Sequence, residues 1–512
     1  MLCGQAYDAH SLAAAAAMLA TRFEWRSGLR AAGRWSGAKP PRRHWSTSSS
    51  TTTGPGGADA VPVSSAGSWE QEAEPKQFKY PGAQGSKFSA KFNVVQAKFR
   101  TPASTFRVLS EAGDLVGSAA APASPEHAPS RHIALAGRET VSQMYKHMVQ
   151  LRVMDEYLYS AQRQGRISFY MTSAGEEAAV IGTAAALKDT DPVFAQYREQ
   201  GVLLWRGFTF QEFCMQCFGK GADKGRQMPV HYGSPELAFH TVSSPLATQL
   251  PQASGAAYAL RLARKGSIKL PASTSGSNGS KKGRSAHSTA GPEDMIVTCF
   301  FGDGAASEGD FHAGLNFSAT LGCPVLFVCR NNGFAISTPT KEQYRGDGVV
   351  MRGLGYGMDA VRVDGNDALA VEYTVREARK HIVEHQVPVL VELMTYRVGH
   401  HSTSDDSSQY REANEMQFYN ERADPLRRLR AYMQRSGWWD DEQDTQYMQD
   451  QKRELLTAIK AAEKEPDTHP MTLFDDVYHE LPPSLVEQRK ELYNHLRSYP
   501  HVYKAAVHDM HV

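Results

Sequence analysis

A strand-helix-strand stretch between residues 295 and 332 constrains the fold of this chain more than any other feature. The apolar runs 295–301 and 324–329 are typical of buried strands, and the helical pattern 311–321 lies between them. Gly302-Asp303-Gly304 follows the first run, and Asn331-Asn332 follows the second. Parallel strands joined in this way open their carboxyl ends into one crevice. The sequence therefore predicts a parallel sheet with polar groups gathered at one edge.

Asp303 and Asn332 have the chemistry of a divalent cation site. A carboxylate, an amide oxygen and a backbone carbonyl just after Asn332 are hard oxygen ligands, which suit Mg²⁺ completed by diphosphate oxygens and water. The flanking glycines let the backbone approach those phosphates. A lone Gly-Asp-Gly is more often a plain turn, but its pairing with Asn331-Asn332 at this spacing favours the metal site.

The same alternation of apolar runs and helical patterns continues through most of the chain. We expect a mostly parallel sheet with helices on both faces, that is, an α/β fold. Further helices are predicted at 140–158, 176–187, 210–218, 252–265 and 367–384, and further strands at 360–363 and 388–396. By composition the chain divides into a leader (1–64), an extended arm (65–139), an α/β domain (140–419) with a disordered insertion (266–292), and a C-terminal helical region and tail (420–512).

The first 50 residues have the composition of an organellar transit peptide. They hold seven basic residues and only two acids, and Arg22, Arg26, Arg30 and Arg34 recur at every fourth position, on one helix face. This pattern favours the mitochondrial matrix as the location. The apolar stretch from Ser11 to Ala20 leaves a secretory signal open, and a plastid route or a disordered tail are further alternatives.

Charge and cysteine content exclude several other classes. With 56 Lys+Arg against 55 Asp+Glu, the chain has no electrostatic reason to bind nucleic acid or an anionic membrane. The longest apolar run is far shorter than the ~20 residues of a spanning helix. Six cysteines are too few for a disulfide framework in so long a chain. We expect Cys214 and Cys217 to lie on one face of a buried helix turn rather than to form a metal or redox site.

Six longer sequence motifs, some of which contain these residues, indicate to which protein family the chain is similar. The segments are 165–172, 196–199, 226–231, 301–310, 330–340 and 394–408. Together they resemble the alpha subunit of the branched-chain 2-oxoacid dehydrogenase decarboxylase component, which depends on thiamine diphosphate, and the resemblance runs from about residue 140 to 478. A pyruvate-specific relative would typically lack the double histidine His400-His401 and the Asp-Asp-Ser-Ser string that follows it.

The resemblance implies a role for a defined set of residues. For Mg²⁺ the ligands would be Asp303, Asn332 and the carbonyl of Phe334. Thiamine diphosphate would be bound by Tyr197, Arg198, Ser244, Leu246, Gly304, Ala305, Arg330 and His401, with His401 also catalytic. A monovalent cation, K⁺, would be held by Ser243, the carbonyl of Pro245, Thr248 and Gln249. Without the resemblance, the arginines could be solvated charges, the Ser-Pro segment a plain turn, and the two histidines exposed polar residues.

The implied activity is oxidative decarboxylation of branched-chain 2-oxoacids, with transfer of the acyl unit to the lipoyl group of a partner acyltransferase. The family also needs a glutamate from a second, pyrimidine-binding domain, and this chain shows only the diphosphate-binding half. A beta subunit must therefore supply the rest, in a heterotetramer of two alpha and two beta chains. Pyruvate dehydrogenase and a non-catalytic scaffold descended from such a subunit are the alternatives.

Ser402 is the predicted regulatory residue, because the family is inactivated by a kinase at this position and restored by a phosphatase. A phosphate there would add about −1.5 to −2 charges beside Asp405, Asp406 and the cofactor's diphosphate. The family's second phosphorylated serine falls on Glu412 here, so control should rest on Ser402 alone. A merely flexible Ser/Thr-rich linker is the alternative.

Overall fold

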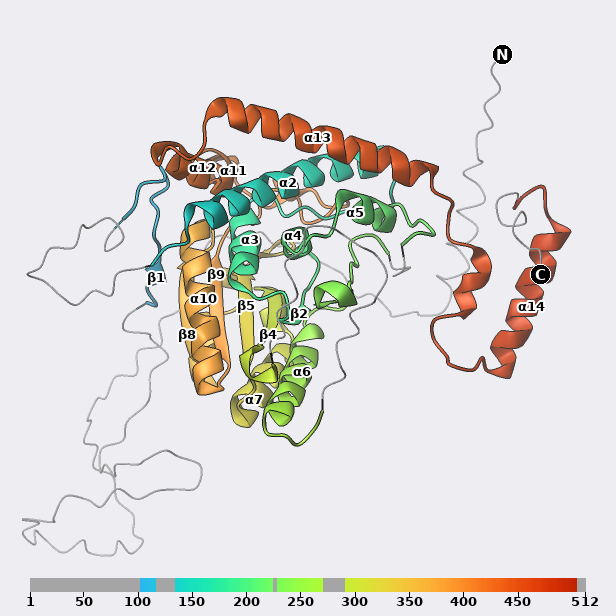
Figure 1. Ribbon diagram of the computed structural model, residues 1–512, viewed down its shortest axis with the longest axis horizontal. Coiled ribbons are helices and arrows are strands. Elements are labelled where there is room, and N and C mark those ends of the chain that lie inside the picture. Colours follow the sequence, from blue (N-terminus) through green and yellow to red (C-terminus); the bar gives the residue numbers. More distant parts are fainter. Residues whose placement is uncertain (1–101, 117–133, 224–227, 270–290, 504–512) are drawn as a thin grey trace, which may run out of the picture. The chain divides into compact units, whose positions relative to one another are not determined.

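The computed structural model describes residues 102–116, 134–223, 228–269 and 291–503 (Figure 1). The predicted transit peptide (1–64), most of the arm (65–139) and nearly all of the insertion (266–292) lie outside these residues, and the division of the chain at those boundaries stays a prediction. Among the helices of the described ranges, none is long and apolar enough to cross a membrane.

A seven-stranded sheet forms the centre of the molecule, in the order β1-β8-β9-β5-β4-β2-β3, and all its pairings are parallel. Its strands are β1 (Thr105–Phe106), β2 (Val193–Phe194), β3 (Phe239–His240), β4 (Val297–Gly302), β5 (Val325–Asn331), β8 (Asp359–Asp364) and β9 (Val389–Met394). The predicted α/β class is confirmed. The two-residue strands β1, β2 and β3 were not predicted, because so short a segment has no readable alternation.

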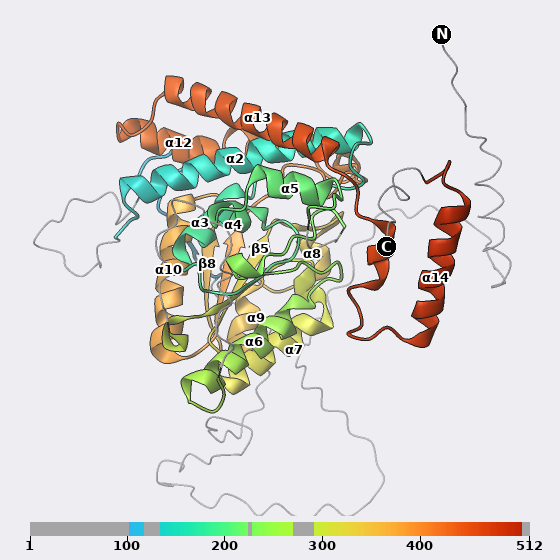
Figure 2. The same cartoon turned by 45° about the vertical axis from the view of Figure 1, so that its right-hand side comes forward.

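Helices cover both faces because side chains along the central strands alternate between two hydrophobic cores. In β5, Leu326 and Val328 belong to one core, whereas Val325, Phe327 and Cys329 belong to the other. The first core is completed by α2 (Arg138–Arg163), α3 (Glu177–Ala186), α4 (Gln200–Trp205), α5 (Phe210–Cys217) and α10 (Ala368–His385). The second is completed by α6 (Gln249–Arg264) and α7 (Gly309–Leu321), which lie side by side (Figure 2).

The C-terminal helices add a layer outside α2. Helix α13 (Asp441–Lys464) runs along α2, and α12 (Pro425–Arg435) also packs against α2 (Figure 1). The ring of Trp439 meets that of Tyr145 edge-on, with centroids 5.6 Å apart. In the sheet-covering layer, Cys214 and Cys217 are free thiols that lie buried on α5, which confirms the predicted buried helix turn. Apart from short 3-10 helices, the described residues also form the hairpin of β6 (Phe334–Ala335) and β7 (Thr338–Pro339), and the helices α8 (Thr340–Gln343), α9 (Val350–Gly355), α11 (Ala413–Glu421) and α14 (Pro483–Ser498).

Candidate active site

The two residues of the predicted metal site emerge from neighbouring strands. Gly302, the last residue of β4, pairs in register with Arg330 of β5, so Asp303 and Asn332 lie at the same edge of the sheet. Asp303 is 1% exposed, and its carboxylate accepts hydrogen bonds from Gln343 (Nε2–Oδ2 3.1 Å) and from the backbone of Asn332. Burial raises the pKa of Asp303 to about 6. A cation beside this carboxylate would offset the cost of its burial.

Glu176 joins the second ligand to the neighbouring arginine, and sequence reasoning missed it. This fully buried carboxylate accepts a hydrogen bond from Asn332 (Nδ2–Oε1 2.5 Å) and forms an ion pair with Arg330. Glu199 accepts from the same arginine (Nε–Oε1 2.6 Å). Burial alone would raise the pKa of Glu176, but Arg330 and Arg198 outweigh it and hold the pKa below its usual range. One sequence feature could have indicated it, because Glu176 and Glu177 are adjacent acids at the start of an otherwise apolar, Ala-rich helix.

His401 lies between two arginines. Its Nδ1 is 3.3 Å from Nη2 of Arg198 and 3.2 Å from Nη1 of Arg397. Both guanidinium groups can only donate, so Nδ1 accepts and the proton of the neutral ring is on Nε2. Burial and these two arginines lower the pKa of His401 to about 3. The ring of Tyr197 meets the imidazole edge-on, with centroids 6.2 Å apart. The imidazole is therefore a neutral donor in a site rich in positive charge.

Hydrogen bonds to Asp405 hold the loop that carries His401 in place. One oxygen of that carboxylate accepts from the backbone N–H of His401 (2.7 Å) and from the hydroxyl of Tyr410 (2.6 Å). Tyr410 in turn accepts from Arg397 (Nη2–Oη 3.0 Å). Ser402 lies inside this loop, and its Oγ accepts from the backbone of Ser404 at 3.2 Å. A charge added at Ser402 would thus appear within the network that positions His401.

The predicted monovalent-cation residues lie in the turn that opens α6. The hydroxyl of Thr248 donates to the carbonyl of Pro245 (3.4 Å), and the buried Gln249 donates to the carbonyl of Phe300 in β4 (3.0 Å). Ser243 is partly buried in the same turn. Ser244 contacts His231 instead (Oγ–Nε2 2.5 Å). Pro245 and Thr248 are thus in contact, whereas Gln249 faces the sheet.

The hairpin β6–β7 packs onto the end of β4. A Cβ atom at Gly304 would lie 2.8 Å from the Cβ of Ala335, so only glycine permits this approach. The backbone N–H of Phe334 donates to Oδ1 of Asn332 at 3.2 Å. The carbonyl of Ile336, at the turn of the hairpin, accepts from Arg397 (2.7 Å). The hairpin therefore links the metal ligands to the His401 loop. Of the other predicted cofactor residues, Ala305 is buried and Leu246 is 39% exposed.

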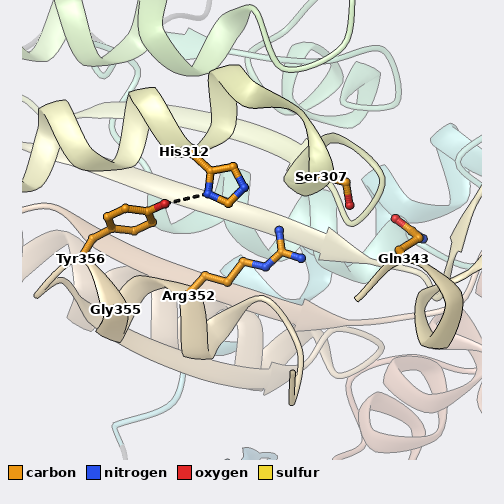
Figure 3. Close-up of a pocket in the computed structure, with 6 residues that line it drawn as sticks. All are labelled: Ser307, His312, Gln343, Arg352, Gly355 and Tyr356. Carbon is orange, nitrogen blue, oxygen red and sulfur yellow. Dashed lines mark hydrogen bonds between the residues drawn. The ribbon is translucent and has the colours of Figure 1, made fainter. Parts of the chain in front are cut away.

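A cavity of about 600 Å³ adjoins this edge (Figure 3). It is lined by Ser307, His312, Gln343, Arg352, Gly355 and Tyr356. Gln343 connects it to the site, because the same side chain donates to Asp303. Within the described residues, no cluster of three or more His, Cys, Asp or Glu side chains is arranged to hold a metal ion. The predicted Mg²⁺ ligand set does not need one, since it has a single carboxylate.

Comparison with known proteins decides the family. The sequence profile of the dehydrogenase E1 component matches residues 145–471. The chain belongs to this family. It is 46% identical over 423 residues to the mitochondrial 2-oxoisovalerate dehydrogenase subunit alpha of Homo sapiens. The aligned region covers 82% of this chain and 86% of that protein. The mitochondrial 2-oxoisovalerate dehydrogenase subunit alpha of Caenorhabditis elegans is 45% identical over 427 residues, which cover 83% of this chain and 90% of that protein. Subunit alpha 1 of Arabidopsis thaliana is 45% identical over 441 residues, which cover 85% of this chain and 84% of that protein.

Enzymes of the E1 family use thiamine diphosphate, and the site fits that cofactor. Asp303 is a buried carboxylate whose pKa is raised by its burial, and it forms no ion pair with a basic side chain of the described residues. At the carboxyl ends of the same strands, the buried guanidinium groups of Arg198 and Arg397 flank His401 and form no ion pair among the described residues. A magnesium diphosphate fits both features, because the cation would offset the burial of the carboxylate and the diphosphate would neutralise the guanidinium groups.

Proposed function

We propose that this chain is the alpha subunit of a branched-chain 2-oxoacid dehydrogenase, catalysing oxidative decarboxylation and acyl transfer to a lipoyl group. The observation that supports it most is that the buried carboxylate of Asp303 and the buried guanidinium groups of Arg198 and Arg397 lie at one sheet edge, and none of them forms an ion pair within the described residues. The motifs around them are those of the E1 family to which the chain belongs. Its relatives are named mitochondrial, in agreement with the location predicted from the N-terminal composition.

Thiamine diphosphate, when bound, supplies the carbanion that adds to the 2-oxoacid and takes up the electrons released as CO₂ leaves. The proposed Mg²⁺ ligands are Asp303, Asn332 and the carbonyl of Phe334. The proposed cofactor-binding residues are Tyr197, Arg198, Ser244, Leu246, Gly304, Ala305, Arg330 and His401. The proposed K⁺ ligands are Ser243, the carbonyl of Pro245, Thr248 and Gln249.

His401 would act as a neutral hydrogen-bond donor. Nδ1 accepts hydrogen bonds from Arg198 and Arg397. The N–H of Nε2 is therefore the group that could donate to an oxygen of the diphosphate or of the reacting acyl unit. The same arginines make a second proton on the ring unfavourable, because they are positive and close. Bound anionic oxygens would shift that balance and allow the ring to exchange protons near neutral pH.

An alpha subunit of this family works with a beta partner and an acyltransferase core. The described chain has one parallel sheet with one cofactor-binding edge. We propose that a beta subunit completes the site in an assembly of two alpha and two beta chains. Large apolar side chains near the C-terminus, among them Leu473 (74% exposed) and Val477 (77% exposed), are suited to a protein interface.

Regulation is proposed to act through Ser402, by a kinase and an opposing phosphatase. The support is its place in the loop in which Asp405 holds both His401 and Tyr410. A phosphate next to Asp405 would repel that carboxylate and loosen the loop. Glu412 occupies the family's second phosphorylation position and cannot be phosphorylated.

Co-expression with the cognate beta chain, followed by a decarboxylation assay across 2-oxoacids, tests the proposed function. We expect turnover of 2-oxoisovalerate well above that of pyruvate, and none from the purified chain alone. Preference for pyruvate would make the chain a pyruvate dehydrogenase subunit. A complex without turnover and without thermal stabilisation by thiamine diphosphate and Mg²⁺ would indicate a non-catalytic scaffold, because a ligand at 100 times its Kd adds roughly 2.7 kcal/mol of stability.

A further inference from the structure

Glu176 stands out among the buried acids because it contacts a proposed metal ligand without being one. Its carboxylate is fully buried at the start of α3, 156 residues away from Asn332 in the chain. One oxygen accepts from the amide of Asn332 (2.5 Å), and the other pairs with Arg330. Every hydrogen bond that reaches an ionised carboxylate must be donated to it.

The orientation of the Asn332 amide follows from this contact. A carboxylate can face only the NH₂ end of an amide, so Nδ2 must point to Glu176 and Oδ1 must point the other way. The backbone N–H of Phe334 donates to that Oδ1 at 3.2 Å, which agrees with this orientation. An oxygen presented toward Phe334 is the orientation that a metal bound by Asn332 and the Phe334 carbonyl requires.

We propose that Glu176 is a positioning residue for the divalent cation, which fixes the Asn332 amide with its oxygen turned toward the metal. This inference rests on the proposed Mg²⁺ site. Residues that orient metal ligands typically change metal affinity by about 10–100-fold when they are replaced.

The substitution Glu176→Gln should reverse the amide. Arg330 can only donate, so it would attract the oxygen of the new glutamine and leave that residue's NH₂ group facing Asn332. Asn332 would then turn its own oxygen toward residue 176 and its NH₂ group toward the metal. We expect the affinity for Mn²⁺, used as a spectroscopic probe in the presence of thiamine diphosphate, to fall by about 10–100-fold.

Glu199→Gln is the matched control. Glu199 is 1% exposed and pairs with the same arginine, but its other recorded contacts are with the backbone of Gln196 and Arg198, not with Asn332. If Glu176 merely neutralised Arg330, the two variants would weaken Mn²⁺ binding alike. We expect Glu199→Gln to bind Mn²⁺ much more tightly than Glu176→Gln does.

A second substitution makes the orientation itself testable. Asn332→Asp presents an oxygen to the metal whichever way the group turns, so Glu176→Gln combined with Asn332→Asp should recover most of the Mn²⁺ affinity. Asn332→Asp alone would place two carboxylates in contact, and it should lower the thermal midpoint of the complex, a loss that Glu176→Gln relieves. The single Asn332→Asp variant tests the contact even if Glu176→Gln does not assemble.

The measurements use the complete complex with its beta subunit, with Mn²⁺ binding followed by electron paramagnetic resonance and stability followed by thermal melting. Equal Mn²⁺ affinity in Glu176→Gln and Glu199→Gln, no recovery in the double variant, or an unchanged midpoint in Asn332→Asp would each overturn the inference. Failure of the proposed metal site is distinguishable, because then the wild type and Asp303→Ala would bind Mn²⁺ equally.

Discussion

Two buried ion-pair regions lie at opposite ends of the same sheet, and they differ in how completely their charges are compensated. At the amino ends of the strands, Asp191 receives two hydrogen bonds from Arg379 (2.7 and 3.0 Å) and two from the backbone N–H groups of Ile296 and Lys188 (both 2.9 Å). Both carboxylate oxygens are satisfied within the chain. This pair needs no ligand.

The carboxyl-end region is not compensated in this way. Asp303 is buried, no cationic side chain of the described residues is in hydrogen-bond contact with it, and its pKa is raised to about 6 by that burial. Arg397 forms no ion pair within the part of the chain that the structure describes, and burial with the nearby arginines lowers the pKa of His401 to about 3. The comparison teaches that a buried charge does not by itself mark a functional site, because a charge compensated within the chain, like that of Asp191, serves the fold.

The largest effect is expected for Asp303→Ala, which removes the only charged ligand proposed for Mg²⁺. Affinity for thiamine diphosphate in the presence of Mg²⁺ should fall at least about 100-fold, because losing a direct ligand costs more than losing an orienting residue. The fold should persist, since Asp303 lies in a loop at a strand end. Calorimetry on the reconstituted complex measures this, and unchanged affinity would refute the metal assignment.

Ser402→Glu should nearly abolish acyl transfer to the lipoyl group, because a negative charge beside Asp405 loosens the loop that holds His401. Ser402→Ala is the matched control, and we expect it to keep substantial activity and to escape inhibition by the kinase. A rate assay with the lipoyl domain as acceptor distinguishes the two. Wild-type rates in Ser402→Glu, or continued kinase inhibition of Ser402→Ala, would exclude this loop as the switch.

Asp191→Asn should affect stability and not ligand binding. Removing one partner of a buried ion pair typically costs about 3–5 kcal/mol, and here Arg379 would keep only the partly exposed Asp294 as an ion-pair partner, at 3.7 Å. Chemical denaturation of the complex should show this loss, while the affinity for thiamine diphosphate and Mg²⁺ in the complex that remains folded should not change. A weakened cofactor affinity would contradict the distinction between the two regions.

The smallest effect concerns pH and His401. The pKa of His401 is about 3 in the folded chain, below the ordinary value of 6.5, so as pH falls below 6.5 the unfolded chain takes up a proton that the folded chain refuses. Folding then loses stability, by roughly 1 kcal/mol near pH 5.5 after allowance for partial exposure. His401→Asn should remove this loss. Unfolding midpoints of the cofactor-free complex at pH 7 and 5.5 check it, and equal pH dependence in both proteins would disprove it.

Most of the fold and the centre of the site could be predicted from the sequence. The runs that became β4, β5 and β9 are long enough to read as buried strands, although β9 ends at Met394, two residues earlier than predicted. The spacing of Asp303 and Asn332 across a strand-helix-strand unit placed both at one sheet edge, as β4 and β5 now show. Strands of two residues could not be predicted, since so short a segment has no readable alternation, and α14 was predicted only as part of the C-terminal helical region, without bounds of its own.

Local sequence by itself determined the longer helices and strands, the parallel pairing of β4 with β5, and the burial of Cys214 and Cys217 on α5. Tertiary structure alone decided which charges meet. Glu176 reaches Asn332 across 156 positions of sequence, and Arg198 reaches His401 across 203. The physical reason is one of scale, because hydrophobic periodicity is set by neighbours a few residues apart, whereas a hydrogen bond requires two atoms within about 3 Å. Only the packing of α3 and the strand-end loops against one sheet edge brings those atoms that close.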